Sequence, residues 1–175
     1  MYGLAGRCGK PIAETRFALA PGACDIDRML KGLDPVLSPD LLHALAAMGH
    51  GDEIAVVDAH FPGATMARRL IRLDGVDAVR VVHAIVSVMP LDSFVEAPAA
   101  GMQVVGEPKT IPEAVADFGR ILDQAEGRKV PIAMLGRQAF YERSRDAFAI
   151  VQTGELRTYA NLILKKGVAG PVIPG

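Results

Sequence analysis

Short apolar runs alternate with helix-like segments along most of this chain. The segments EIAVVDA, VPIAML and FAIVQTGE contain nearly continuous apolar stretches, at residues 53–59, 130–135 and 148–155. Such stretches are typical of strands that are covered on both faces of a sheet. Between them, residues 111–127 place apolar side chains at helical spacing. Strands that alternate with helices predict an α/β fold, here a single-domain α/β/α sandwich around a mostly parallel or mixed sheet.

The remaining elements follow from their end signals and apolar patterns. Residues 38–49 are the clearest helix, with Ser38 as its N-cap and Pro39 at the first helical position. Gly49 is expected to end this helix in the left-handed conformation. Residues 76–89 have the length of a helix, but their many valines leave helix and strand open. Three further strands and one further helix are expected at residues 68–75, 102–106 and 159–167, and at residues 137–147.

Length and composition restrict the class of protein. The 175 residues suit one domain, and 50% apolar with 22% charged residues are the proportions of a soluble chain that folds. A net charge of −1, without any run of Lys and Arg, argues against a nucleic-acid partner. The chain has no apolar run of about 18 residues, the length that crosses a bilayer, so no association with a membrane is expected.

The beginning of the chain lacks the regular pattern of the rest. Residues 1–28 hold both cysteines, Cys8 and Cys24, and have no apolar core of signal-peptide length. Two cysteines make no disulfide framework, so a reducing, cytoplasmic setting is expected. We expect a poorly ordered N-terminal extension at residues 1–28 and one α/β domain at residues 29–175.

Two polar residues flank the strand expected at residues 53–57, whose apolar run is residues 54–57. His50 follows a helix C-terminus, where the helix dipole favours the imidazolium form, and can donate or accept a proton near neutral pH. Asp58 closes the run, and ligands of open α/β sheets collect beyond the carboxyl ends of strands. The ordinary alternatives are a solvated histidine at a helix end and an aspartate that caps the following loop. The residue types alone leave both alternatives open.

Further polar candidates lie later in the chain. Tyr159 and Asn161 are expected on one face of an extended segment, where a phenol and a carboxamide can form hydrogen bonds with the hydroxyl groups of a ligand. Arg137 follows a strand and can hold polyol oxygens or a carboxylate. The alternatives are an ordinary strand entry and a surface ion pair. His60 forms a D-x-H pair with Asp58, but no third ligand has convincing spacing, so no metal is expected.

Three separated segments occur in a distinctive order. They are MLKGLDPVLSPDLLHALAAMGHGDEIAVVDAHFP, GRQAFYERSRDAFAIVQTGE and YANLILKKGV, between Met29 and Val168. They resemble the family of fucose mutarotases and ribose pyranases. The resemblance implies an isomerase that needs no cofactor and interconverts the anomers of a free monosaccharide, with L-fucose as the expected sugar. The alternatives are ribose pyranase activity and a non-catalytic sugar-binding accessory of sugar uptake.

The resemblance also implies site residues and an assembly. The proton-donating histidine of the family matches His50. Its substrate-binding residues match Asp58, Arg137, Tyr159, Ala160 and Asn161. The arginine and the DAHFP segment look like the fucose branch, whereas Ala160 stands where that branch has glycine. Because members of the family form ring-shaped decamers, the resemblance implies a homo-oligomer, a decameric ring.

Strand geometry favours a site that is shared between subunits. A straight strand over residues 53–57 spans roughly 16 Å at about 3.3 Å per residue, with His50 beyond one end and Asp58 beyond the other. Either the loop of residues 49–52 folds back, or His50 of one subunit completes a site with Asp58 of its neighbour. We favour the second arrangement.

Overall fold

Six strands form the sheet of the computed structural model, which describes residues 30–170. The strands are β1 (Glu53–Val57), β2 (Leu70–Leu73), β3 (Ala99–Met102), β4 (Ile132–Leu135), β5 (Ala149–Thr153) and β6 (Leu162–Lys165). The helices are α1 (Pro39–Ala47), α2 (Gly63–Met66), α3 (Ala78–Val86), α4 (Glu113–Glu126) and α5 (Arg137–Asp146). The extension expected at residues 1–28 lies outside the described residues.

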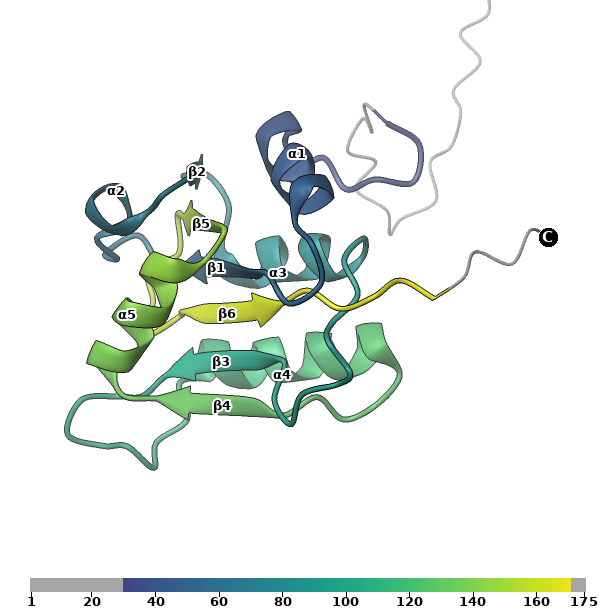
Figure 1. Ribbon diagram of the computed structural model, residues 1–175. Helices are drawn as coiled ribbons and strands as arrows, with labels where there is room; N and C mark the ends of the chain where they lie inside the picture. Colours follow the sequence, from purple (N-terminus) through teal and green to yellow (C-terminus); the bar gives the residue numbers. More distant parts are fainter. Residues whose placement is uncertain (1–29, 171–175) are drawn as a thin grey trace, which may run out of the picture.

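The direction of β6 determines which segments meet at the edge of the sheet that is formed by the strand ends. The strand order is β2-β5-β1-β6-β3-β4, and β6 is antiparallel to both of its neighbours, β1 and β3. The other strand pairs are parallel. Strand β6 therefore begins at the edge where β1, β3 and β4 end (Figure 1). Residues that precede β6 are thereby brought next to residues that follow the parallel strands.

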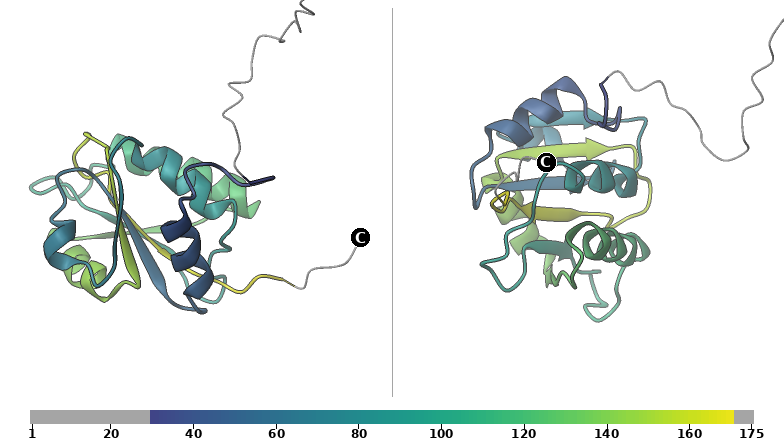
Figure 2. Two further views of the ribbon diagram at one scale, coloured as in Figure 1. Left: turned by 90° about the horizontal axis from the view of Figure 1, so that it is seen from above. Right: turned by 90° about the vertical axis from the view of Figure 1, so that its right-hand side faces the viewer.

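Helices cover both faces of the sheet. Helices α3 and α4 lie on one face, and α5 lies on the other with α2 beside it (Figures 1 and 2). Ile54 and Val56 of β1 pack in the apolar cluster that includes α1, α3 and α4. Ala55 and Val57 pack in the cluster of α5, because successive strand residues point to opposite faces. The predicted α/β/α sandwich around a mixed, mostly parallel sheet is confirmed.

The segment of residues 76–89, which left helix and strand open, is helical. Asp77 caps α3, and its carboxylate accepts a hydrogen bond from the backbone N–H of Arg80 at 2.8 Å. Val81 and Val82 are completely buried in this helix. Tertiary packing therefore outweighs the strand preference of the valines.

The strand expected at residues 102–106 is wrong. Strand β3 runs from Ala99 to Met102 instead, and the chain then leaves the sheet. Its Ala-Ala-Gly-Met sequence has little strand propensity. A side chain at Gly101 would lie 3.1 Å from the Met134 sulfur of β4, so close packing between the two strands favours small residues here.

Helix α1 begins as predicted but ends differently. The Ser38 hydroxyl accepts a hydrogen bond from the backbone N–H of Leu41 at 3.3 Å. Met48 at the C-cap is extended, and the left-handed conformation falls on Gly51, with φ of 86°, rather than on Gly49. Two residues, Met48 and Gly49, therefore follow α1 before the turn at residues 50–51 leads into β1.

Candidate functional site

A buried aspartate–asparagine pair lies where β1 ends and β6 begins. The Asn161 carboxamide donates from Nδ2 to Asp58 Oδ2 at 2.8 Å, and its Oδ1 accepts from the backbone N–H of Asp58 at 3.0 Å. Asp58 Oδ1 also accepts from the backbone N–H of His60 at 3.0 Å. Only 4% of Asp58 and 3% of Asn161 is exposed. Because a carboxylate has about four acceptor sites, Asp58 keeps capacity for hydroxyl groups of a ligand.

A cavity of about 180 Å³ opens beside this pair. It is lined by Asp58, His60, Phe61, Met102, Arg137, Tyr141, Thr158, Tyr159 and Asn161. These residues come from the ends of β1 and β3, the start of α5 and the segment before β6. Pockets for drug-sized ligands take roughly 300–1,000 Å³, so this cavity suits a smaller molecule.

Arg137 and Tyr159 reach the cavity from different local structures. Gly136 follows β4 and is the N-cap of α5, so Arg137 is the first residue of that helix. Tyr159 was expected in an extended strand, and this is wrong, because it lies in a turn with a left-handed φ of 63°. The turn, rather than strand alternation, brings Tyr159 and Asn161 to the same cavity.

An aromatic wall completes the cavity and was missed from the sequence. The ring of Phe61 packs edge-to-face on Phe140 and Tyr141, with ring centroids 6.2 and 5.3 Å apart. Tyr141 thereby adds apolar area and a hydroxyl to the cavity. A helical spacing of four residues places Tyr141 on the same face of α5 as Arg137, a signal in the sequence that could have identified it.

His50 lies beyond the opposite end of β1. Its Nε2 is 3.3 Å from Asp92 Oδ1, and its ring packs edge-to-face on Phe94 with centroids 5.7 Å apart. The His50 side chain is 48% exposed, whereas that of Asp92 is 4% exposed. Phe94 is 77% exposed. The histidine and the aromatic ring therefore stand on an open surface above a buried carboxylate.

Asp92 is the polar partner that sequence reasoning missed. The backbone N–H of Phe94 donates to Asp92 Oδ1 at 2.9 Å. This hydrogen bond, together with the one from His50, holds the pKa of Asp92 below its usual value although burial opposes it. The backbone N–H of Asp92 donates to the carbonyl of Lys165 at the end of β6. No short sequence motif contains both Asp92 and His50, because their contact forms only when the sheet is assembled.

Lys166 stabilises the helix end that precedes His50. Its ammonium group donates to the carbonyls of Leu45 and Met48, at 2.8 and 2.6 Å. A cation is favoured at this end of a helix. The helix dipole that was expected to act on His50 is thus met by a lysine, and His50 pairs with Asp92 instead.

The structure brings some predicted residues together and separates others. Those that line one cavity are Asp58, Arg137, Tyr159 and Asn161. His50 lies at the far end of β1, as the strand geometry predicted. The side chain of Ala160 is completely buried in the apolar cluster of α3 and α4 and does not line the cavity. Within residues 30–170, no three His, Cys, Asp or Glu side chains gather as a metal site requires.

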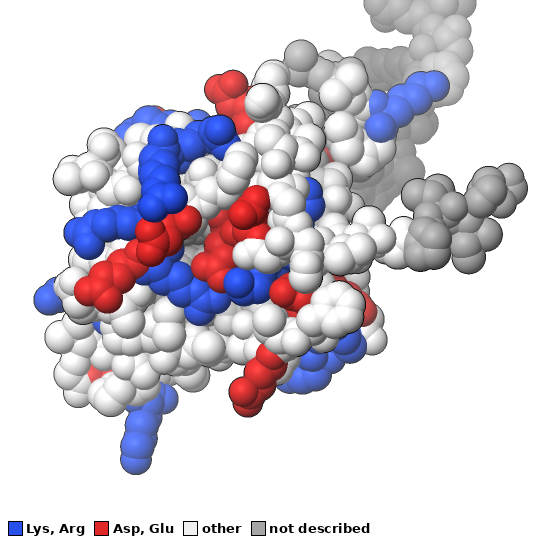
Figure 3. Space-filling model, in the orientation of Figure 1, with Lys and Arg blue, Asp and Glu red and all other residues white. Residues whose placement is uncertain are grey.

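The surface carries charges of both signs. On the face shown in Figure 3, the described Lys and Arg side chains are interspersed with Asp and Glu. Neither sign forms a continuous field over the described part of this face. Among the helices of residues 30–170, none combines the length and apolar character needed to cross a membrane.

The α/β sandwich and its small polar cavity at the strand ends define a class, that of small-ligand-binding α/β domains. The chain belongs to the RbsD / FucU transport protein family, whose model matches residues 31–169. This confirms the resemblance seen in the sequence motifs.

Named relatives are similar over nearly the whole of their own length. The chain is 41% identical over 140 residues to the L-fucose mutarotase of Actinobacillus pleuropneumoniae, a match that covers 80% of this chain and 97% of the relative. It is 43% identical over 149 residues to the fucose mutarotase of Bos taurus, covering 82% and 96%. The fucose mutarotase of Streptococcus pneumoniae, solved in complex with L-fucose, is 44% identical with a TM-score of 0.76, covering 81% of this chain and all of that one.

Proposed function

We propose that this protein is an isomerase that interconverts the anomers of L-fucose. The observation that carries the proposal is the cavity in which the Asp58–Asn161 pair meets Arg137 and Tyr159. A carboxylate, a carboxamide, a guanidinium and a phenol together donate and accept the hydrogen bonds that sugar hydroxyls make. The relatives named as L-fucose mutarotases, and the solved complex with L-fucose, support this sugar.

Anomer exchange is a proton-transfer reaction. The anomeric hydroxyl gives up its proton, the ring oxygen takes one, and the bond between C1 and the ring oxygen breaks. Rotation about C1–C2 and closure on the other face of the aldehyde give the second anomer. A histidine that both accepts and donates a proton supplies the acid–base catalysis. His50 holds Asp92 through Nε2, so Nδ1 is the nitrogen left to exchange a proton with the sugar, directly or through water.

The cavity residues hold the sugar in place during this exchange. Two hydrogen bonds join Asp58 and Asn161 and fix the orientation of the two residues relative to each other. Arg137 and Tyr159 add contacts from a helix start and a turn. Fixing several hydroxyls at once keeps C1 and the ring oxygen in a constant orientation toward the catalytic group.

We infer that His50 reaches this sugar from a neighbouring subunit. The five residues of β1 separate His50 from Asp58, and they span roughly 16 Å at about 3.3 Å per residue. A single monosaccharide does not bridge that distance. Phe94, exposed beside His50, is the kind of apolar side chain that a subunit contact buries. A head-to-tail contact of this kind closes into a ring, and we propose a decameric one.

Proton NMR of anomer exchange tests the activity. L-fucose and D-ribose are each incubated with wild-type protein and with the His50→Ala variant. Faster exchange of L-fucose with the wild type, lost in the variant, supports the proposal. Faster exchange of D-ribose alone moves the assignment to ribose pyranase. Saturable binding with no acceleration of either sugar makes this a sugar-binding protein.

Mixed oligomers test the shared site. In a shared site, His50→Ala and Asp58→Ala oligomers are each inactive, because every site lacks one of the two groups. When the two variants are coexpressed in equal amounts, roughly a quarter of the sites combine an intact His50 with an intact Asp58 from a neighbour. Activity then returns to about a quarter of the wild-type value. No recovery in oligomers that native mass spectrometry shows to be mixed contradicts the shared site.

We also propose a cytoplasmic location. It rests on the sparing use of cysteine, with two in 175 residues, which suits a reducing compartment. A mutarotase of this kind acts on a monosaccharide that is already free. Cell fractionation with a marker enzyme for each compartment tests the location.

A further inference from the structure

Tyr159 has open space on both of its sides. It lines the cavity of Asp58 and also a second hollow of about 390 Å³ beside the start of α4. Its hydroxyl accepts a long hydrogen bond, 3.4 Å, from the backbone N–H of Val105. A left-handed φ in a non-glycine residue persists when the surroundings hold it. Tyr159 packs partly against the apolar cluster that includes Met102 and Phe140, and the two hollows leave the rest of its side chain uncovered.

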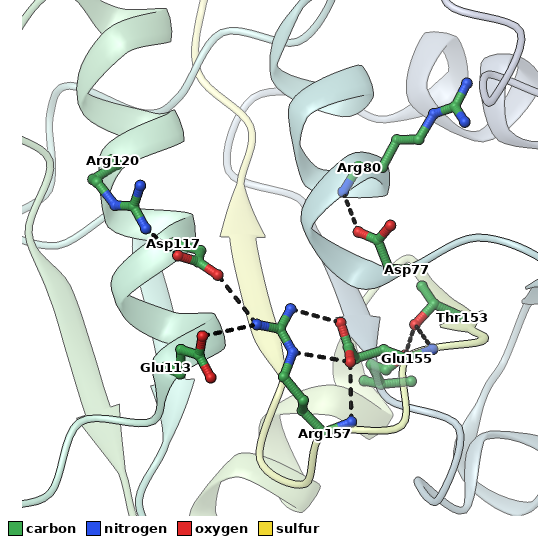
Figure 4. Close-up of polar contacts among 9 residues, drawn as sticks. Asp77, Arg80, Glu113, Asp117, Arg120, Thr153, Glu155 and Arg157 are labelled. Carbon is green, nitrogen blue, oxygen red and sulfur yellow. Dashed lines mark hydrogen bonds and ion pairs between the residues drawn. The ribbon is translucent and has the colours of Figure 1, made fainter.

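Arg157, two residues earlier, is held by several carboxylates (Figure 4). Its guanidinium donates from Nε and Nη2 to the two oxygens of Glu155, at 3.1 and 2.9 Å. The third nitrogen, Nη1, donates to Asp117 of α4 at 3.2 Å and lies 4.0 Å from Glu113. We call the two-pronged contact with Glu155 the fork of Arg157, and a contact of this kind fixes the plane of the guanidinium. Arg157 thus joins the segment before β6 to helix α4.

Glu155, the main partner of Arg157, is itself fixed next to the cavity. It is 5% exposed, and its carboxylate also accepts a hydrogen bond from the backbone N–H of Arg157 at 3.0 Å. Its backbone carbonyl accepts from the N–H of Ala59, the residue after Asp58, at 2.9 Å. The contacts therefore run without a break from Asp58 through Glu155 and Arg157 to α4.

We propose that Arg157 is a positioning residue that holds the Tyr159 turn against the sugar cavity. The proposal rests on the proposed role of Tyr159 in sugar binding. The contacts of Arg157 with Glu155 and Asp117 fix the turn on one side, and the Asn161–Asp58 pair fixes it on the other. Without the fork, Tyr159 has room to move toward the hollow beside α4. Loss of Arg157 then weakens sugar binding and leaves the proton transfer by His50 intact.

The test compares Arg157→Met and Arg157→Lys with Arg120→Met. Arg120 pairs with the same Asp117 of α4 but does not reach the turn, so it is the matched control (Figure 4). Removal of the Arg157 fork is expected to raise KM for L-fucose about five- to tenfold and to change kcat less than about twofold. Arg157→Lys keeps the charge without the fork, and its KM lies between those of wild type and Arg157→Met.

A double-variant cycle with Tyr159→Ala separates positioning from general loosening. If Arg157 acts through Tyr159, Arg157→Met adds little to the KM of the Tyr159→Ala protein. Fully additive effects, or an Arg120→Met protein that weakens binding equally, overturn the proposal. Kd for L-fucose is measured by calorimetry in the same variants. The positioning role is then decided on Kd even if the wild type binds L-fucose without accelerating exchange, a result that overturns only the proposed function.

Discussion

The two ends of β1 carry groups of opposite character. At the carboxyl end, Asp58 is almost completely buried and is tied by hydrogen bonds to Asn161 and to the backbone of His60. At the amino end, His50 is about half exposed and pairs with Asp92 on an open surface. One end holds its polar groups in a cavity within the subunit, whereas the other presents His50 on the open surface.

This difference fits the proposed function, in which one end binds the sugar and the other supplies the catalyst. A buried pair that is already hydrogen-bonded is preorganised to receive hydroxyls and loses little freedom when a sugar binds. An exposed histidine beside an exposed Phe94 suits a group that meets its substrate when another subunit docks. We therefore expect changes at the His50 end to alter rate, and changes at the Asp58 end to alter affinity and stability.

The largest effect is expected for His50→Ala. Removal of an acid–base catalyst lowers kcat by about 10²–10⁴-fold. Kd for L-fucose, measured by calorimetry, changes less than about threefold, because the cavity of the neighbouring Asp58 stays intact. His43→Ala, on the exposed side of α1, is the control and keeps full activity. A loss of affinity as large as the loss of rate erases the distinction between the two ends.

A smaller loss of rate is expected for Asp92→Asn. The carboxylate orients both the His50 ring and the backbone of Phe94. Because the Phe94 N–H and His50 hold the pKa of Asp92 below its usual value, the group is a carboxylate at neutral pH, and the variant removes a charge there. We expect kcat to fall about 10- to 100-fold, the loss that is typical when a carboxylate partner of a metal-bound histidine is removed.

The pH profile distinguishes this role from a structural one. With Asp92→Asn, the acid limb of kcat against pH is expected to shift, because the group that faces the histidine has lost its charge. Asp52→Asn is the control, since the carboxylate of Asp52 accepts the backbone N–H of Gly49 and does not touch the His50 ring. An unshifted profile with reduced stability marks Asp92 as a structural residue.

The positions of His50 and Asp58 beyond the two ends of β1 were predictable because their signals are local. Each residue follows an element whose type and end can be read from nearby residues. The position of Asp92 was not predictable, because its contact with His50 depends on β6. The backbone N–H of Asp92 donates a hydrogen bond to the carbonyl of Lys165 at the end of that strand. Local patterns carry no information on such a contact between distant segments.

The same contrast holds for the fold. Strands with continuous apolar runs, such as β1 and β5, were placed correctly. Strand β3 was misplaced because close packing at Gly101, rather than strand propensity, selects its residues. The turn at Tyr159 was taken for a strand because a left-handed φ is uncommon in a non-glycine residue, and a tyrosine gives no signal of it in the sequence.

Asn161→Ala is expected to affect stability more than His50→Ala does. It leaves the backbone N–H of Asp58 and one carboxylate oxygen without their buried partner. An unsatisfied buried polar group costs about 1–3 kcal/mol of unfolding free energy. His50→Ala, at a half-exposed site, is expected to cost less, because Asp92 keeps its hydrogen bond from the Phe94 N–H. Urea unfolding of both variants measures the difference. Equal destabilisation means that the Asp58 end is no better ordered than the other.

The smallest effect concerns the acid stability of the His50 end. Glu53 begins β1 and accepts hydrogen bonds from Arg143 at 2.8 Å and from Lys165 at 2.9 Å. Burial by itself raises the pKa of Glu53, but the two cations outweigh it and lower the pKa below 4.5. Glu53 therefore binds a proton less readily in the folded protein than in the unfolded chain.

Linkage gives the sign of the effect. A group with a lowered folded pKa stabilises the protein above its unfolded pKa, and this stabilisation is lost as the pH falls through the folded pKa. Wild type is therefore expected to lose stability between about pH 5 and pH 3 more steeply than Glu53→Gln, which cannot titrate. Urea midpoints at pH 7, 5, 4 and 3 measure the slopes, with Glu142→Gln on the surface of α5 as control. Parallel slopes for wild type and Glu53→Gln contradict this prediction, and they place the acid sensitivity of the protein elsewhere than at the start of β1.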